Sequence, residues 1–363
     1  MKIALLGPYP PPLGGVSISI MHLARLLRED GNQVKIFVEE KEQDTASPVT
    51  QWYSARCLHP SRNLLLKVRE YSPDVLHSQS STVRKYDAMI ARLLSVPLIY
   101  HVHGERFQEQ FSSWTFWSRQ LTAWSFRQAR IIIPVSRELA NFVGTFGITP
   151  DKIVTIPSLL PLEPPTVTPV NFPGWLDTVI KNTDNKAVLV SSGFYDTHYG
   201  LSLVPQIASD LKSRQINFIW IIVGPGSKEE IARLQREIDE AGVGDRIIQS
   251  GALDRAQMIA LLGAAHVYVR TKFSDSFGIV IAEAHQLGCY CLFADNNPYF
   301  QADGKRLFSY RVGSRDSITE ELLEILAQLD PNAPPDMESR FRKEAESHYQ
   351  QIKQLYRQAI EQD

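Results

Sequence analysis

The chain has 363 residues, of which 44% are hydrophobic, so it has the length for about two globular domains with well-packed cores. Its 38 lysines and arginines nearly balance its 40 acidic residues, and this balance argues against a nucleic-acid partner. The three cysteines are too scattered for a disulfide framework, and there is neither a signal-peptide pattern nor an apolar run of about 20 residues, so we expect a cytoplasmic protein.

Short β-rich apolar runs alternate with segments of helical period along the whole sequence. In the first half these runs are residues 2–7, 33–39, 74–79, 98–104 and 130–136. In the second half they are residues 187–193, 217–226, 246–253, 266–271 and 289–295. Such alternation is typical of parallel sheets covered by helices. The sequence therefore predicts an α/β protein with two doubly wound, Rossmann-like domains.

A proline-rich stretch at residues 157–175 has no hydrophobic period and separates the two series. It divides a first domain, residues 1–160, from a second domain, residues 161–339. Ligands of such folds bind at the carboxyl ends of the parallel strands, so we expect a cleft where those ends of the two domains face each other.

One glycine-rich turn follows the first predicted strand of the first domain, and another follows the second predicted strand of the second domain. Gly14 and Gly15 precede a helical segment in the first half, and Gly224 and Gly226 do so in the second. Glycine lets a backbone approach a ligand closely, and a helix N-terminus favours an anion, although an ordinary turn is the alternative. The full dinucleotide fingerprint is missing, so a nicotinamide cofactor is not supported.

The stretch SDSFGIVIAEAHQLG, residues 274–288, places a glutamate inside an apolar helical run. Ser276 is expected to cap that helix, whose first amides, at Phe277 and Gly278, would suit phosphate oxygens. Glu283 lies on an apolar face where water solvates it poorly, so ligand hydroxyls could satisfy it. The alternative is a structural glutamate paired with an arginine or lysine.

Taken in order, these segments resemble the retaining GT-B glycosyltransferases, particularly the large family 4, over nearly the whole chain. DSFGIVIAEAHQLG resembles the family's E-x7-E segment, and GPYPPPLGGVSISIMHLARLL resembles its N-terminal glycine loop and first helix. Further similar segments are PDVLHSQS, IPVSRELANFVGTFGITPDKIVTIPS and IIVGPGSKEEIARLQREIDEAGVGDRIIQSGAL. The resemblance implies the GT-B fold and retaining transfer of a sugar from a nucleotide diphosphate sugar, without a metal or another cofactor.

The resemblance also implies roles for domains and residues. The first domain would bind the acceptor, the second the nucleotide sugar, and the final segment, residues 340–363, would be a helix that crosses back to the first domain. Glu283 would bind the ribose hydroxyls, Asp275 would contact the sugar, and His103 would lie near the transferred sugar. His101 and His103 could by themselves suggest a metal, but no nearby carboxylate and histidine set completes such a site.

The sequence departs from the family at the residues that should bind the diphosphate, which we call the diphosphate grip. The family commonly has an arginine after a glycine and a lysine a few residues later, whereas the matching segment, SSGFYDTHYGLS, has Phe194 after Gly193 and then Tyr199. Asp275 is also one methylene shorter than the usual glutamate. Either the grip has been rebuilt from other cations or catalysis has been lost.

The cations nearest to this segment and to the expected helix N-terminus are Arg270, Lys272 and His198. We expect the first two to form the rebuilt grip, since side chains two apart point to one face if the strand continues through Lys272. An exposed surface charge is the alternative for each.

Seven aromatic side chains and several arginines crowd residues 107–130, FQEQFSSWTFWSRQLTAWSFRQAR. This mixture suits a membrane interface or a lipid-linked acceptor, and a helix buried against its own domain is the alternative. We therefore predict a hexosyltransferase acting on a lipid-linked surface-polysaccharide or lipopolysaccharide intermediate, with peripheral contact to the inner face of the membrane. The other reading is a catalytically silent GT-B protein that binds a nucleotide sugar or glycan as an assembly partner.

Overall fold

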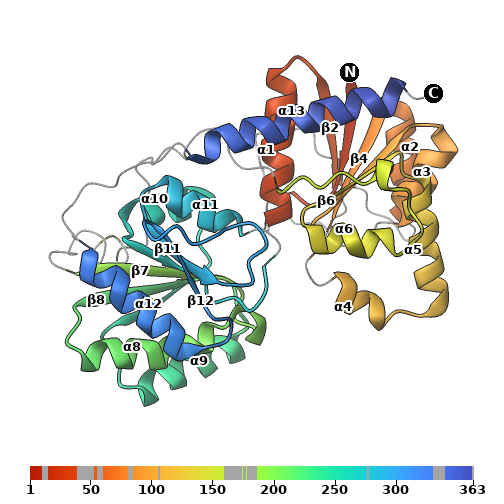
Figure 1. The fold of residues 1–363 in the computed structure, drawn as a ribbon. Helices are drawn as coiled ribbons and strands as arrows, with labels where there is room; N and C mark the ends of the chain where they lie inside the picture. The colour runs from red at the N-terminus through yellow and green to blue at the C-terminus, as the bar shows by residue number, and fades with distance from the viewer. Residues whose placement is uncertain are drawn as a thin grey trace. The chain divides into compact units, whose positions relative to one another are not determined.

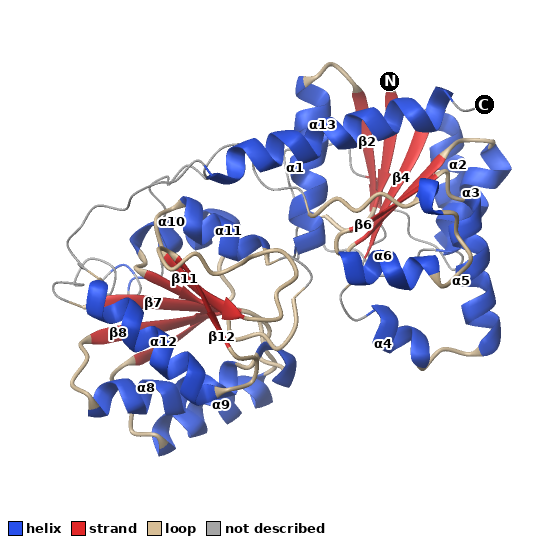
Figure 2. Cartoon of the chain, viewed as in Figure 1, coloured by secondary structure: helices blue, strands red, loops and turns tan. Residues whose placement is uncertain are grey.

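The chain divides into two compact α/β units, each a parallel sheet flanked by helices (Figures 1 and 2). The computed structural model describes residues 1–9, 15–38, 53–54, 60–80, 85–104, 107–158, 174, 177, 186–275, 278–329 and 340–361. Unit 1 comprises Met1–Pro161 and Glu344–Asp363, and unit 2 comprises Leu162–Lys343. The predicted class of two parallel-sheet domains is confirmed, and each unit is described by itself.

Unit 1 has a six-stranded sheet in the order β3-β2-β1-β4-β5-β6, which is the Rossmann order. Its strands are β1 (Lys2–Leu6), β2 (Gln33–Val38), β3 (Tyr53–Ser54), β4 (Val75–Ser80), β5 (Leu98–Val102) and β6 (Ile131–Pro134). Five of them lie within the predicted apolar runs or one residue beyond them. The sequence did not predict β3, because two residues at the sheet edge give no apolar pattern.

The helices of unit 1 cover this sheet with their apolar faces. They are α1 (Gly15–Glu29), α2 (Pro60–Tyr71), α3 (Lys85–Leu94), α4 (Phe107–Ser112), α5 (Phe116–Gln128), α6 (Arg137–Gly144) and α13 (Arg340–Glu361). Side-chain caps fix two of the starts: Thr115 accepts a hydrogen bond from the Ser118 amide, and Ser136 accepts one from the Leu139 amide.

Unit 2 repeats the same strand order, β12-β11-β10-β7-β8-β9, with every pair parallel. Its strands are β7 (Ala187–Ser192), β8 (Phe218–Val223), β9 (Ile247–Gly251), β10 (Val267–Val269), β11 (Tyr290–Ala294) and β12 (Leu307–Tyr310). The five predicted strands of this half are present, and the unpredicted β12 is again a short strand at the sheet edge.

Helices cover both faces of the second sheet, with α10 and α11 on one side and α8, α9 and α12 on the other (Figure 2). They are α8 (Val204–Ser213), α9 (Lys228–Glu240), α10 (Arg255–Ala264), α11 (Ile279–Gln286) and α12 (Arg315–Gln328). Capping boxes start α9, from Ser227 and Glu230, and α10, from Asp254 and Gln257. The sequence therefore fixes where these two helices begin.

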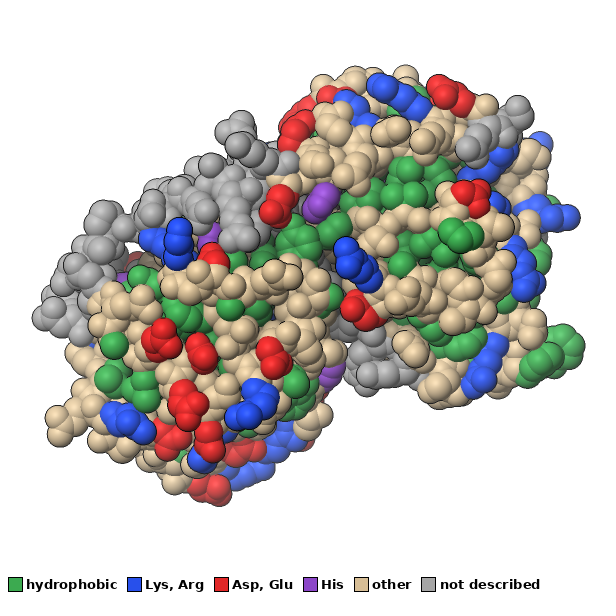
Figure 3. Space-filling view, in the orientation of Figure 1, with side chains coloured by type: hydrophobic (Ala, Val, Ile, Leu, Met, Phe, Trp, Pro, Cys, Tyr) green, Lys and Arg blue, Asp and Glu red, His purple; other side chains and the backbone are tan. Residues whose placement is uncertain are grey.

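Acidic and basic side chains are interspersed on the face of unit 2 in view in Figure 3, as the near-neutral net charge suggests. Among the described helices, none combines the length and apolar character that crossing a membrane requires. Most of the predicted linker, residues 159–173, lies outside the described residues, as do Gly14, Ser276 and Phe277.

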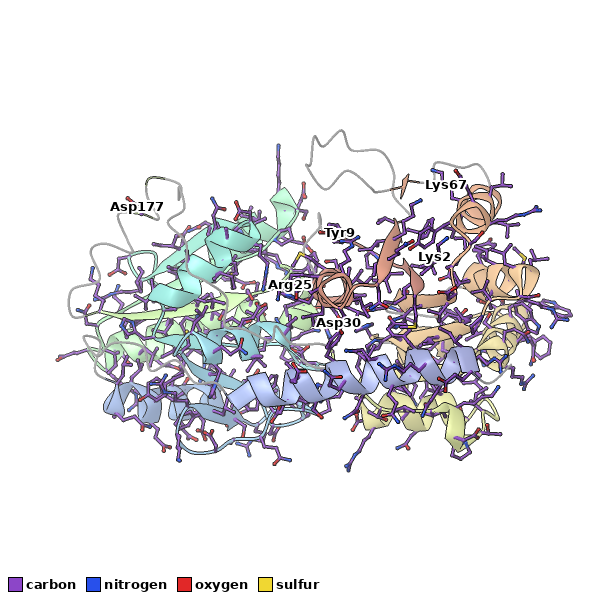
Figure 4. The ribbon with its side chains drawn as sticks, turned by 90° about the horizontal axis from the view of Figure 1, so that it is seen from above. Lys2, Tyr9, Arg25, Asp30, Lys67 and Asp177 are labelled. Atoms are coloured by element: carbon purple, nitrogen blue, oxygen red, sulfur yellow. The ribbon has the colours of Figure 1, made fainter. Side chains whose placement is uncertain are left out.

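The last helix, α13, packs on unit 1, although the whole of unit 2, Leu162–Lys343, lies between it and that unit's other elements in the sequence. The Tyr356 hydroxyl lies 2.6 Å from Nδ1 of His77 on β4, and this hydrogen bond is buried. The Tyr349 hydroxyl donates to Oδ2 of Asp30 over 2.7 Å, and the Lys353 ammonium lies 2.5 Å from the same oxygen. Figure 4 shows Asp30 at the end of α1 beside this helix. The hydrogen bonds from Lys353 and Tyr349 lower the pKa of Asp30.

Candidate functional site

The carboxyl ends of β7 and β10 form the topological switch point of unit 2, where ligands of doubly wound sheets bind. The chain leaves β7 through Gly193 and leaves β10 through Arg270. The guanidinium of Arg270 donates from Nη1 to the Ser192 carbonyl over 3.0 Å, so it ties the two strand ends together. The Tyr310 hydroxyl on β12 donates to the Arg270 carbonyl over 2.8 Å. The residue after β10 is thereby fixed on both its side chain and its backbone.

Arg270, Lys272 and Asp275 form a buried ion cluster at this switch point. Nε of Arg270 donates to Oδ2 of Asp275 over 2.7 Å, and Nζ of Lys272 lies 3.7 Å from Oδ1. All three side chains are at most 12% exposed. Burial alone would raise the pKa of Asp275, but the two cations overcome that effect and lower it. Two cations therefore lie beside one carboxylate at this switch point.

The ring of Tyr199 lies against both cations of this cluster. The Arg270 guanidinium carbon is 5.3 Å and the Lys272 ammonium 5.0 Å from the ring centroid, within the range of cation–π attraction. Phe194, which is exposed, packs edge-on to Tyr199 with the centroids 5.5 Å apart. Of the two aromatics that stand where the family has cations, Tyr199 therefore lies against other cations in space, and Phe194 packs on Tyr199.

The route by which Lys272 reaches the cluster differs from the prediction. We expected β10 to continue through Lys272, but the strand ends at Val269. Instead, Oγ1 of Thr271 donates to the Tyr199 carbonyl over 2.7 Å, and the Phe273 amide donates to the His198 carbonyl over 3.1 Å. These bonds hold residues 270–273 against the turn that follows β7. The convergence of Arg270 and Lys272 is therefore a product of tertiary structure and not of strand alternation.

The predicted donor-site glycines of unit 2 are required by the packing of their own turns. A Cβ on Gly193 would lie 2.0 Å from the Tyr199 ring, and one on Gly226 would lie 2.9 Å from Tyr195. A Cβ on Gly224, whose φ is 152°, would lie 1.8 Å from the Gly193 carbonyl oxygen. In unit 1, Gly15 begins α1 and has open space where a Cβ would be. A role of these glycines in donor binding stays a prediction.

The predicted start of the helix that carries Glu283 is wrong. We expected Ser276 to cap it, but α11 begins at Ile279, with Gly278 as its N-cap in a left-handed conformation at φ 82°. A Cβ on Gly278 would lie 2.7 Å from Ile281 and 3.2 Å from Oδ2 of Asp275. Gly278 thus lets the chain turn from the ion cluster directly into the helix.

Glu283 is fully buried in α11, and the structure contains the ion pair expected under the alternative reading. Its Oε1 accepts a hydrogen bond from Nη2 of Arg255 over 2.5 Å, so a structural ion pair exists. Its other oxygen, Oε2, has no hydrogen-bond partner among the described residues. The sequence analysis missed Arg255, because the packing of α10 on α11 has no signature in the sequence. One carboxylate oxygen remains for ligand hydroxyls.

In unit 1, three histidines stack on one another: His77 within β4, His101 near the end of β5 and His103 just after that strand. The rings of His77 and His101 have centroids 5.6 Å apart, and those of His101 and His103 are 4.2 Å apart. Nε2 of His103 lies 3.1 Å from Oε1 of Gln79, and Nδ1 lies 3.1 Å from the Ser158 hydroxyl. The amide oxygen can only accept, so this arrangement places a proton of His103 on Nε2, while the Ser158 hydroxyl can donate to Nδ1.

Burial lowers the pKa of every histidine in this stack. The pKa of His101 falls to about 3, although the backbone of Ile156 opposes the shift. The pKa values of His77 and His103 fall well below the usual range because of burial, and the neighbouring imidazoles add to the effect. The three rings are therefore neutral at physiological pH. In the described part of the chain, no three histidine, cysteine or acidic side chains gather as a metal site would need, and metal independence stays a prediction.

The aromatic segment predicted to meet an acceptor or membrane divides into an inner and an outer set. Phe107 and Phe126 are fully buried, so the buried-helix reading holds for them. Phe116 and Trp117, by contrast, are 65% and 75% exposed at the start of α5, and Leu121 is exposed one turn later. Figure 3 shows hydrophobic side chains with basic ones beside them near this helix.

Comparison with known proteins gives relatives over nearly the whole chain. The model of the family described as Glycosyltransferase Family 4 matches residues 13–163, and that of Glycosyl transferases group 1 matches residues 177–348. A D-inositol 3-phosphate glycosyltransferase of Pseudarthrobacter chlorophenolicus is 23% identical over 336 residues, covering 79% of this chain and 77% of that protein.

Solved structures of similar fold also span both units. HepE of Anabaena, in complex with UDP and glucose, has a TM-score of 0.76 at 14% identity and covers 98% of this chain and 99% of its own. Sucrose-phosphate synthase from Thermosynechococcus elongatus has a TM-score of 0.72 at 16% identity, with 98% of each chain covered. WaaG, described as a glycosyltransferase involved in lipopolysaccharide biosynthesis, has a TM-score of 0.64 at 15% identity and covers 99% of this chain and 98% of its own.

The histidine stack predicts how stability depends on pH. The unfolded chain binds protons below a histidine pKa of about 6.5, whereas the folded stack does not, so the free energy of unfolding should fall between about pH 6.5 and 3. Each histidine contributes up to about 1.4 kcal/mol per pH unit in that window. Urea unfolding at a series of pH values measures the slope. His101→Phe keeps an aromatic ring and should make the slope shallower, and an identical slope in this variant would contradict the account.

Proposed function

Since the chain belongs to the family 4 glycosyltransferases of the GT-B fold, we propose that it is a retaining hexosyltransferase that uses a nucleotide diphosphate sugar without a metal. The observation that carries the proposal is the buried cluster of two cations, Arg270 and Lys272, beside Asp275 at the switch point of unit 2. A diphosphate leaving group gains negative charge as the sugar departs, and fixed cations in a poorly solvated site stabilise that charge most effectively.

Within the cluster we assign the diphosphate to Arg270 and Lys272 and the sugar to Asp275. The carboxylate is held ionised by its two neighbours, so it can accept hydrogen bonds from sugar hydroxyls. Bound phosphate would share the two cations with Asp275. Before the donor binds, the Asp275 carboxylate would hold the two cations in place.

We assign His103 to the sugar and Glu283 to the ribose. His103 has a pKa well below the usual range, so it would act as a neutral hydrogen-bonding group and not as a charged acid. Glu283 would accept hydrogen bonds at its unpaired oxygen, Oε2. Gly15, Gly193, Gly224, Gly226 and Gly278 would border the donor, and the same role is proposed for Gly14, Ser276 and Phe277, which lie outside the described residues.

For the acceptor we propose a lipid-linked glycan of the surface-polysaccharide or lipopolysaccharide type. Two observations support it: the exposed Phe116 and Trp117 on α5, and a structural relative that is described as acting in lipopolysaccharide biosynthesis. Exposed aromatics beside basic side chains suit the boundary between lipid headgroups and acyl chains. Unit 1 would then bring the enzyme to the membrane surface as a peripheral protein.

One observation favours the alternative, a catalytically silent nucleotide-sugar-binding protein. Both cations of the cluster are already neutralised in part by Asp275, and the family's own cations are replaced by Phe194 and Tyr199. Incubation with UDP-, GDP- and dTDP-sugars, followed by chromatography of the released nucleotide, separates the two functions. Release from one donor supports the enzyme, binding without release supports the silent protein, and neither binding nor release contradicts both.

The first test of the site concerns Glu283. Glu283→Ala should weaken nucleotide binding by roughly 1–3 kcal/mol, because hydrogen bonds from ribose hydroxyls to a charged acceptor are lost. Calorimetric titration with the bound nucleoside diphosphate measures the change, with circular dichroism to check the fold. Unchanged affinity in the folded variant would reject the assignment.

The second test concerns the rebuilt diphosphate grip. Arg270→Gln or Lys272→Met should lower kcat by on the order of a hundredfold, as loss of one charge-stabilising donor does, with Arg270 having the larger effect because it also holds Ser192. Lys212→Met is the matched control, since Lys212 pairs with Asp245 on the exposed surface of the same unit. If both cluster variants transfer sugar at the wild-type rate, the cluster is not the grip.

The third test concerns the membrane contact. The double variant Phe116→Ser and Trp117→Ser should reduce binding to vesicles containing an anionic phospholipid by roughly tenfold or more, because two large apolar side chains no longer insert. Sedimentation with the vesicles measures it. Leu66→Ser, which removes an exposed apolar side chain from α2, is the control. Equal binding by the double variant and the wild type would contradict the proposed surface.

A further inference from the structure

The ion pair between Arg255 and Glu283 in unit 2 has a carboxylate that is fully buried. Glu283 is fully buried, whereas the Arg255 side chain is 24% exposed. The pair of Lys212 and Asp245, by contrast, has both partners well exposed. Surface ion pairs of that kind contribute little to the free energy of unfolding. A buried carboxylate, by contrast, is strongly destabilising if its one cation is removed.

We propose that Arg255 is a positioning residue of the donor site, which keeps Glu283 ionised and holds it by one oxygen so that the other stays available to ribose hydroxyls. This inference rests on the proposed function, in which Glu283 binds the ribose. Arg255 itself need not touch the ligand.

Arg255 would have two effects on Glu283: it would keep the carboxylate ionised, and it would leave one carboxylate oxygen available. A buried carboxylate without a partner would take up a proton, and a protonated glutamic acid is a poorer acceptor for sugar hydroxyls. The guanidinium, which is always charged, prevents this by lying 2.5 Å from Oε1. It contacts only that oxygen, so Oε2 is left without a partner among the described residues, at a cost that bound hydroxyls would remove.

The position of Arg255 is fixed by its helix. It is the first residue of α10, directly after Asp254, whose side chain accepts from the Gln257 amide over 2.8 Å while Gln257 returns a bond to the Asp254 amide over 3.1 Å. This capping box anchors the start of α10, and α10 packs on α11, which carries Glu283. Arg255 therefore reaches Glu283 from a rigid helix start and not from a free loop.

The test is the pH dependence of nucleotide binding by Arg255→Gln. UDP, GDP and dTDP are titrated by calorimetry between pH 5.5 and 8.5. The wild type should bind its nucleotide with nearly constant affinity. In Arg255→Gln the buried carboxylate loses its cation and should be protonated more easily, so affinity should drop as the pH falls, by up to about tenfold for each pH unit.

Two further variants tie the effect to Glu283. The double variant Arg255→Gln and Glu283→Gln has no carboxylate to titrate, so its weakened binding should not vary with pH. Arg315→Gln removes an arginine that pairs with Asp316 at the surface of α12, and it should follow the wild type. Should Arg255→Gln fail to fold, Arg255→Lys decides, because a flexible ammonium lacks the planar fork and should bind nucleotide about threefold or more weakly.

Each outcome bears on the inference in a defined way. If the wild type binds a nucleotide and Arg255→Gln binds it with the same affinity, the role of Arg255 is overturned and the proposed function stands. The same holds if Arg255→Gln binds more weakly by an amount that does not change with pH. Wild-type affinity in Arg255→Lys overturns it where that variant carries the test. A wild-type protein that binds none of the three nucleotides overturns the proposed function and this inference together.

Discussion

Burial of ionised side chains at the carboxyl ends of the second sheet is the constraint on which that unit depends. A charge removed from water destabilises a fold unless opposite charges and hydrogen bonds offset the cost. Asp275 meets this condition through Arg270 and Lys272, and Glu283 meets it through Arg255. The first places two cations beside a single carboxylate, and the second keeps one carboxylate oxygen of Glu283 without a hydrogen-bond partner within the described residues. These two features match a ligand with phosphate at one end and hydroxyl donors at the other, as in a nucleoside diphosphate.

In unit 1 the buried histidine stack carries no charge. The stacked rings of His77, His101 and His103 are neutral, and the Tyr356 hydroxyl of α13 completes one end of the stack. A neutral stack costs less to bury than an ion cluster, but it makes the unit sensitive to acid, because only the unfolded chain can bind the protons. It also links the packing of the C-terminal helix to the histidine proposed to contact the sugar.

The sequence was sufficient for the architecture and for much of the candidate site, and the reasons for its failures are physical. Apolar runs bounded by turns predicted ten strands, whereas β3 and β12 are short strands at sheet edges. The start of α11 was misplaced because a left-handed Gly278 ends the preceding loop, and a serine two residues earlier looks like a better cap. The clustering of Arg270 with Lys272 was predicted for the wrong reason, since loop hydrogen bonds produce it. Arg255 was missed, because only the packing of α10 on α11 brings it to Glu283.

The central claim is that a nucleoside diphosphate binds to two groups of unit 2, its phosphates to Arg270 and Lys272 and its ribose to Glu283. A crystal structure of the protein with bound UDP, GDP or dTDP, whichever it binds most tightly, tests this most directly. The account predicts phosphate oxygens within hydrogen-bonding distance of Arg270 or Lys272, and ribose hydroxyls donating to Oε2 of Glu283 while Oε1 remains with Arg255. A bound nucleotide with its phosphates away from both cations, and with Oε2 still unpaired, would contradict it.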